Sequence, residues 1–271
     1  MQLLVLTDFS PAADHALAYA DSLAARLGAG LVLLHVQRTS PLDPAALTGT
    51  LSPLSEGEIA VALAQRSASL TVPALVEATA ARVPEATQAA VRRHQPALLI
   101  VGKSAAADAS PEVVAHTTAL ELLHSIECPI LLVPEHTLAP VPPRRVSIAA
   151  DDQPFSPISA ATSVSTWLQQ LSADFTVVHV AEPEDNDSAV TAHQQVTNSG
   201  LLPPATTLHQ HGVRSLSIAD GILQATQETA ADLLIVQARH HNWLGNFFHR
   251  SVTAQLVRRT TLPVLIVAEA K

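Results

Sequence analysis

The sequence predicts an α/β protein built from two tandem copies of one domain, each with a parallel sheet flanked by helices. Short blocks of sequence recur in the same order in the two halves. Each block is a continuous apolar run, which is typical of strands buried on both faces. Amphipathic helical patterns lie between the blocks. Because strands and helices alternate, we expect right-handed crossovers and helices on both faces of each sheet.

The internal repeat is the strongest signal in the sequence. Leu3–Asp8 returns as Val146–Asp151, Leu33–Val36 as Val177–Val180, Pro96–Val101 as Ala231–Val236, and Pro129–Val133 as Pro263–Val267. Four matches in one order are hard to obtain by chance. They place one domain at residues 1–138 and the other at residues 139–271. The linker near residues 136–145 carries three prolines in four residues, which favours a stiff, extended spacer.

Local signals predict the individual elements. The first helix follows Ser10 and Pro11, a good N-cap and first helical residue, and Gly28 is a natural stop. Further helices of the first half are expected at Glu56–Ser69, Pro84–His94 and Pro111–Ser125. Each half is expected to contain five strands, and those of the second half lie near residues 145–150, 174–181, 205–211, 231–237 and 262–268.

Composition excludes several classes of function. The net charge is −9, and neither half carries a surplus of basic residues, so no nucleic-acid partner is expected. No apolar stretch reaches the roughly 20 residues that span a bilayer, so no membrane partner is expected either. The N-terminus enters a strand pattern without a signal peptide, and the one cysteine, Cys128, lies in an apolar run. We therefore expect a cytoplasmic protein.

No catalytic motif appears in the sequence, and we expect a protein that is not an enzyme. It has no nucleophile elbow, no Walker A motif and no cysteine–histidine pairing at an obvious site. Thirteen histidines invite a metal hypothesis. His209 and His211 share one strand face, and His240, His241 and His249 lie elsewhere. None of these has the spacing of zinc ligands, so we expect no metal site.

The order of the recurring blocks resembles that of a known family. The first strand ends in Asp8, the second ends in His35–Val36, the fourth runs into Gly102, and Cys128–Pro129 precedes the last strand. This order resembles a universal stress protein domain, and its repetition resembles a tandem member of that family. The resemblance implies two Rossmann-like five-stranded sheets of order 3-2-1-4-5, related to the adenine-nucleotide α-hydrolases. It also implies pairing through the fifth strands, which would form a pseudo-dimer within the chain. A homodimer of the whole chain is a further expectation.

Some members of that family bind ATP through a glycine motif after the fourth strand, in which backbone amides surround the phosphates. The motif reads Gly, two residues, Gly, nine residues, Gly, and Ser or Thr. The first half keeps only Gly102, and His116 and Thr117 follow at the distal end after a one-residue insertion. In the second half, the corresponding segment begins at Gln237 and ends at Arg250–Ser251, and none of the three glycine positions holds a glycine. Both nucleotide sites are therefore interpreted as degenerate, and no cofactor is expected.

Family positions still define candidate contacts. The resemblance assigns Asp8, Val36, Gly102, Lys103 and Thr117 to the first cleft, and Asp151, Arg250 and Ser251 to the second. One hypothesis is a non-enzymatic stress-response protein that acts through protein contacts with unidentified partners. The alternative is an ATP-binding regulatory switch that uses the first cleft, with cationic side chains in place of the lost amides. A third hypothesis is metal or small-ligand binding by the histidines. For Asp8 a role in the turn before the first helix is an equal alternative.

Overall fold

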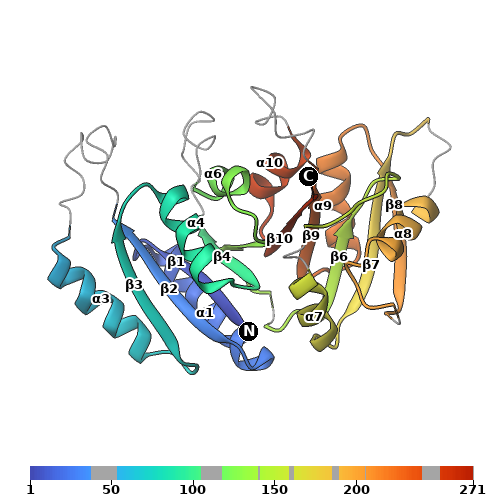
Figure 1. Ribbon diagram of the computed structural model, residues 1–271. Coiled ribbons are helices and arrows are strands. Elements are labelled where there is room, and N and C mark those ends of the chain that lie inside the picture. The colour runs from blue at the N-terminus through green and yellow to red at the C-terminus, as the bar shows by residue number, and fades with distance from the viewer. Residues whose placement is uncertain are drawn as a thin grey trace.

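The computed structural model describes residues 1–37, 54–104, 118–139, 141–158, 162–184, 189–204, 206–239 and 251–270. Within these residues the strands form one ten-stranded sheet in the order β3-β2-β1-β4-β5-β10-β9-β6-β7-β8. Figure 1 shows this sheet running from β3 at one end of the molecule to β8 at the other, with helices on both faces.

The first half has the predicted strand order 3-2-1-4-5, with parallel pairing throughout. Its elements are β1 (Gln2–Thr7), α1 (Pro11–Leu27), β2 (Gly30–Gln37), α3 (Glu56–Ala68), β3 (Ala74–Ala80), α4 (Val83–His94), β4 (Leu98–Lys103), α6 (Thr118–Ser125) and β5 (Ile130–Pro134). The predicted ends of α1 are confirmed, because Ser10 accepts a hydrogen bond from the backbone of Ala13 and Gly28 adopts a left-handed φ of 60°. Residues 111–117 of the predicted fourth helix lie outside the described residues.

The second half repeats this order around β6. Its elements are β6 (Arg145–Ala149), α7 (Thr162–Gln170), β7 (Asp174–Ala181), α8 (Ala189–Asn198), β8 (Leu208–Arg214), α9 (Ile218–Glu228), β9 (Leu233–Ala238), α10 (Val252–Arg259) and β10 (Val264–Ala268). Strand β8 begins later than the predicted residues 205–211. The reason is a turn in which the Thr206 amide donates to the carbonyl of Pro203, so that the chain becomes extended only after it.

The two halves join through their fifth strands, as expected. β5 and β10 pair antiparallel, with Leu131 opposite Leu265 and Ile130 opposite Ile266. The expectation of two separate sheets is thereby corrected to one continuous sheet. Since the pair is antiparallel, the carboxyl ends of β5 and β10 lie at opposite ends of the seam.

Two apolar layers cover the sheet, and both extend across the seam. One layer contains buried residues of α1, α3, α7 and α8, and the other contains residues of α4, α6, α9 and α10. Trp167 of α7 is the largest fully buried side chain, with 1% exposure. No helix of the described residues is long and apolar enough to cross a membrane.

Polar contacts hold the linker against the second half. The buried carboxylate of Asp232 accepts hydrogen bonds from the amides of Arg144 and Arg145, each at 3.0 Å. Tyr19 of α1 reaches the same region from the first half. Burial raises the pKa of Tyr19, and the Asp232 charge adds to this effect. Asp232 therefore fixes the linker to the second half, and its charge acts on a side chain of the first half.

We expect the halves to unfold together, because the seam and both apolar layers are shared. Leu131→Ala in β5 should cost about 2–5 kcal/mol, since the side chain is 1% exposed. In a Trp243→Phe background, urea unfolding followed by Trp167 fluorescence should shift as much as unfolding followed by far-UV circular dichroism. Leu75→Ala, at a 52% exposed position of β3, should change stability by less than about 0.5 kcal/mol. An unchanged Trp167 transition in Leu131→Ala would show that the halves unfold independently.

Candidate functional site

The first cleft lies where β1 is flanked by β2 and β4, the position at which doubly wound sheets bind ligands. Asp8 follows β1 and is exposed. Its carboxylate accepts a hydrogen bond from the amide of Ser10 at 3.0 Å, which closes a turn before α1. Asp8 therefore has the turn role considered from the sequence. The same carboxylate also remains accessible at the mouth of the cleft.

A ring stack fixes the loop after β1, and sequence patterns gave no sign of it. Phe9 has a φ of 65°, which is unusual for a bulky residue. Its ring stacks on His35 at 4.3 Å between centroids, and the Arg66 guanidinium lies 4.7 Å from the Phe9 centroid. His35 Nδ1 donates to the carbonyl of Thr7 at 2.9 Å, because a carbonyl oxygen can only accept. Strand β2 and helix α3 thus hold this loop in a strained conformation.

Arg66 is itself anchored on α1. Its guanidinium binds the carboxylate of Asp14 through two hydrogen bonds of 2.6 and 2.8 Å. The bidentate geometry orients the guanidinium plane over the ring of Phe9. The stack therefore serves the fold of the first half.

His179 repeats the hydrogen bond of His35 in the second half, where its Nδ1 donates to the carbonyl of Ala150 at 3.0 Å.

Gly102 is required by packing at the end of β4. A Cβ atom built on Gly102 would lie 2.4 Å from the carbonyl oxygen of Ala12 and 2.8 Å from the amide nitrogen of Ala13. The first turn of α1 occupies that space, so only glycine fits. Val36, at the end of β2, is half-buried and packs against the layer that contains α4 and α6. The retained glycine thus has a structural reason that is independent of phosphate.

Lys103 makes its hydrogen bonds with the second half of the chain. Its Nζ donates to the carbonyls of Arg258 at 2.9 Å and Thr260 at 2.7 Å, at the end of α10. These contacts satisfy carbonyls that lack helical partners, and the ammonium charge matches the negative end of the helix dipole. Burial lowers the pKa of Lys103 to about 8. This lysine therefore connects the two halves at the seam.

The remaining predicted site residues divide into two groups. Thr117 and Arg250 lie outside the described residues. Ser251 is the N-cap of α10, where its hydroxyl accepts a hydrogen bond from the amide of Ala254 at 3.1 Å. The Ser251 oxygen thus has a helix-capping role.

At the second cleft, Arg239, which follows β9, is bound to the loop after β6. Its guanidinium binds Asp151 with Nε–Oδ2 at 2.9 Å and Nη2–Oδ1 at 2.5 Å. It also donates to the carbonyls of Gln153 at 2.9 Å and Pro154 at 2.8 Å, and to Glu269 at 3.0 Å. Asp151 is the counterpart of Asp8, so the carboxylate that defines this cleft is already paired with a cation.

Gln237 stands at the position of Gly102 in the repeat. Its amide nitrogen is buried and has no hydrogen-bond partner within the described part of the chain. The loop after β6 pairs with the end of β10 through an antiparallel bridge between Pro157 and Glu269. Ile158 donates to the carbonyl of Ala268 at 3.0 Å, and Ala270 donates to that of Ser156 at 2.7 Å.

Of the two histidines on β8, His211 pairs with a carboxylate. β8 is an outer edge strand, as expected, and His211 lies 2.6 Å from Glu228 of α9. Among the described residues, no group of three metal-ligating side chains is close enough to hold an ion. His240, His241 and His249 lie outside the described residues.

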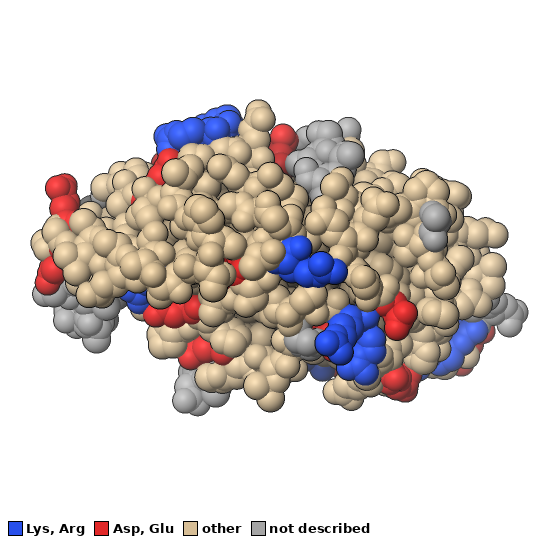
Figure 2. Space-filling model, turned by 90° about the horizontal axis from the view of Figure 1, so that it is seen from below, with Lys and Arg blue, Asp and Glu red and all other residues tan. Residues whose placement is uncertain are grey.

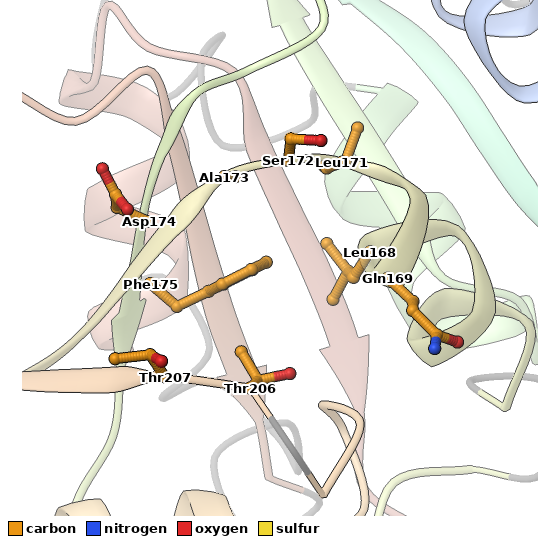
Figure 3. Close-up of a pocket in the computed structure, with 9 residues that line it drawn as sticks. All are labelled: Leu168, Gln169, Leu171, Ser172, Ala173, Asp174, Phe175, Thr206 and Thr207. Carbon is orange, nitrogen blue, oxygen red and sulfur yellow. The ribbon is translucent and has the colours of Figure 1, made fainter.

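A surface hollow of about 310 Å³ lies at the amino end of β7, away from the carboxyl ends of the strands. Figure 3 shows Phe175 and Leu168 pointing into the hollow and Thr206 and Thr207 beside it. It carries one charged side chain, Asp174. Figure 2 shows one face of the molecule, largely covered by uncharged residues with separate blue and red groups. On this face the basic residues form separate groups and not one continuous surface.

The fold is that of a tandem, doubly wound α/β protein with one topological switch point in each half. The family model described as the universal stress protein family matches residues 1–134 and 143–268. The chain therefore belongs to the universal stress protein family.

Solved structures agree with this fold. A universal stress protein from Archaeoglobus fulgidus DSM 4304 superposes with a TM-score of 0.72 at 16% identity, covering 100% of this chain and 97% of that chain. A functionally unknown protein from Pseudomonas aeruginosa PAO1 gives 0.56 at 16% identity, covering 99% and 92%. No curated protein matches the chain in sequence.

Gly102→Ala should destabilise the protein by about 1–3 kcal/mol, because the new methyl group meets the backbone of α1. Gly57→Ala is the matched control. A Cβ atom there meets nothing within 4 Å, and the change should be neutral or stabilising by up to about 1 kcal/mol. Chemical denaturation of both variants without nucleotide measures the difference. Equal stability of the two variants would remove the packing explanation for Gly102.

Lys103→Met should lower the free energy of unfolding by about 1–3 kcal/mol, since two carbonyls of α10 lose their donor. Arg82→Met, whose side chain is 80% exposed, should have little effect. Urea unfolding at neutral pH compares the two. If Lys103→Met were as stable as the parent protein, the contact with α10 would contribute nothing to the free energy of unfolding.

Proposed function

We propose that this universal stress protein is a non-enzymatic stress-response factor that acts through protein contacts in the cytoplasm. The observation that carries the proposal is the pairing of Asp151 with Arg239. A nucleotide entering the second cleft would have to displace a bidentate ion pair. In this proposal the second domain binds no nucleotide.

Charge argues in the same direction for the first cleft. Its one cation at the end of β4, Lys103, is engaged by α10. The sequence from 105 to 117 contains no lysine or arginine, and it contains the acidic residues Asp108 and Glu112. Phosphate groups would therefore meet little positive charge. Weak or absent nucleotide binding follows in this proposal.

The outer edge of the sheet supports a role in protein contacts. β3 is an edge strand, and Leu75 and Val76 on it are 52% and 42% exposed. Unpaired edges with apolar side chains tend to pair with other chains. A partner or a second copy of the chain could use this edge.

The alternative function is an ATP-binding switch that uses the first cleft. The exposed carboxylate of Asp8 favours it, because Asp8 keeps the position assigned to nucleotide contact, whereas its counterpart Asp151 is paired. In that case a nucleotide would bind once per chain, and Asp8→Ala would weaken it.

Thermal unfolding with Mg-ATP, AMP or adenosine separates these functions. A site with a Kd of about 10 µM would stabilise the protein by about 2.7 kcal/mol at roughly 1 mM ligand. We expect a shift in Tm below about 1 °C for each ligand. A larger shift that is lost in Asp8→Ala and kept in Asp152→Ala would establish the switch.

A further inference from the structure

The guanidinium of Arg239 has a complete set of partners. An arginine side chain carries five N–H donors, and here all five are used. Two go to the carboxylate of Asp151, one to the carboxylate of Glu269, and two to the carbonyls of Gln153 and Pro154. The side chain is 16% exposed. Such saturation is the arrangement expected of a formed binding site, because a solvated arginine would share its donors with water.

The surroundings select a flat cation. Asp151 accepts the fork of the guanidinium with two oxygens, a geometry that an ammonium group does not match. The ring of Phe155 lies 5.8 Å from the guanidinium carbon, which is a cation–π distance. Burial alone would lower the pKa of Arg239, but the hydrogen bonds and charge of Asp151, then Glu269, raise it. The charged form is therefore favoured within the site.

The contact joins three segments of the second half. Asp151, Gln153 and Pro154 belong to the loop after β6, Arg239 follows β9, and Glu269 follows β10. Without the guanidinium, the carboxylates of Asp151 and Glu269 would face each other without a shared cation. In the first half, Ser104 occupies the place of Arg239 in the repeat. Within the part of the chain that the structure describes, the contact is therefore a feature of the second half, and Asp8 has no equivalent of it.

From this arrangement we propose that the second cleft is a guanidinium-binding site, which Arg239 fills from within the chain. The ligand class of this cleft has changed from an anion to a flat cation, and the occupant is supplied by β9. Arg239 keeps the carboxyl ends of β6, β9 and β10 together in the absence of any other ligand. The inference deepens the proposed function at the second domain, and its test uses no nucleotide, so that the two can fail separately.

Arg239→Ala tests the site by removing the occupant and supplying it again from solution. The variant should melt roughly 5 °C below the parent protein, because two carboxylates lose their partner. Ethylguanidinium, which replaces the deleted atoms, should restore much of this loss at millimolar concentration. Ethylammonium, which has the same charge without the fork, should not. Parent protein, with its site filled, should show no stabilisation by either compound.

Two comparisons keep the result interpretable. Arg93→Ala removes an arginine that is 60% exposed and bound to Glu77 by one hydrogen bond, and ethylguanidinium should not stabilise it. If Arg239→Ala does not fold, Asp151→Asn keeps the size of the side chain and removes its charge. Hydrogen exchange should then be faster at the amides of Ile158 and Ala270 than in the parent protein. No rescue of a folded Arg239→Ala, or unchanged exchange in Asp151→Asn, would overturn the proposal.

Discussion

The antiparallel pairing of β5 with β10 is the interaction on which the rest of the structure depends. Each strand would otherwise be a buried-type apolar strand at an open sheet edge, the kind of edge that associates with other chains. Pairing converts two five-stranded sheets into one and allows both helical layers to continue across the seam. It also brings α10 beside the end of β4, where Lys103 reaches its terminal carbonyls. The side chain at this position of the first cleft is therefore defined by the neighbouring domain.

The two clefts have diverged although their scaffolds match. Asp8 and Asp151 occupy equivalent places, and each carboxylate accepts a hydrogen bond from the amide two residues further along the chain. Among the described residues, Asp151 alone of the two is also bound by a guanidinium, that of Arg239. At the end of the fourth strand, Gly102 allows the first turn of α1 to approach closely, and Gln237 replaces it in the second half. Such differences are compatible with one fold because they lie in loops at the carboxyl ends of the strands. They give the halves different surfaces without changing the core.

The sequence predicted those features that depend on local pattern. Buried parallel strands are continuous apolar runs, and Ser10, Pro11 and Gly28 mark the ends of α1 by capping alone. The predicted bounds of β8 start too early, because nearly all side chains of this edge strand are exposed or half-buried and form no such run. At the site, the loss of glycines was readable from the family pattern. The pairing of Arg239 with Asp151, 88 residues apart, was not, because no local pattern encodes a contact between loops.

Native mass spectrometry of the purified full-length chain, before and after addition of Mg-ATP, tests the central claim most directly. The claim is that contacts within the chain have replaced the nucleotide in this universal stress protein. It predicts a mass equal to the polypeptide alone as isolated and no retained adenine nucleotide at about 1 mM Mg-ATP. One or two adenine nucleotides retained per chain would contradict it. One nucleotide per chain would show that the first cleft still functions as a nucleotide site. Two would show that a nucleotide displaces Arg239 from Asp151 in the second cleft.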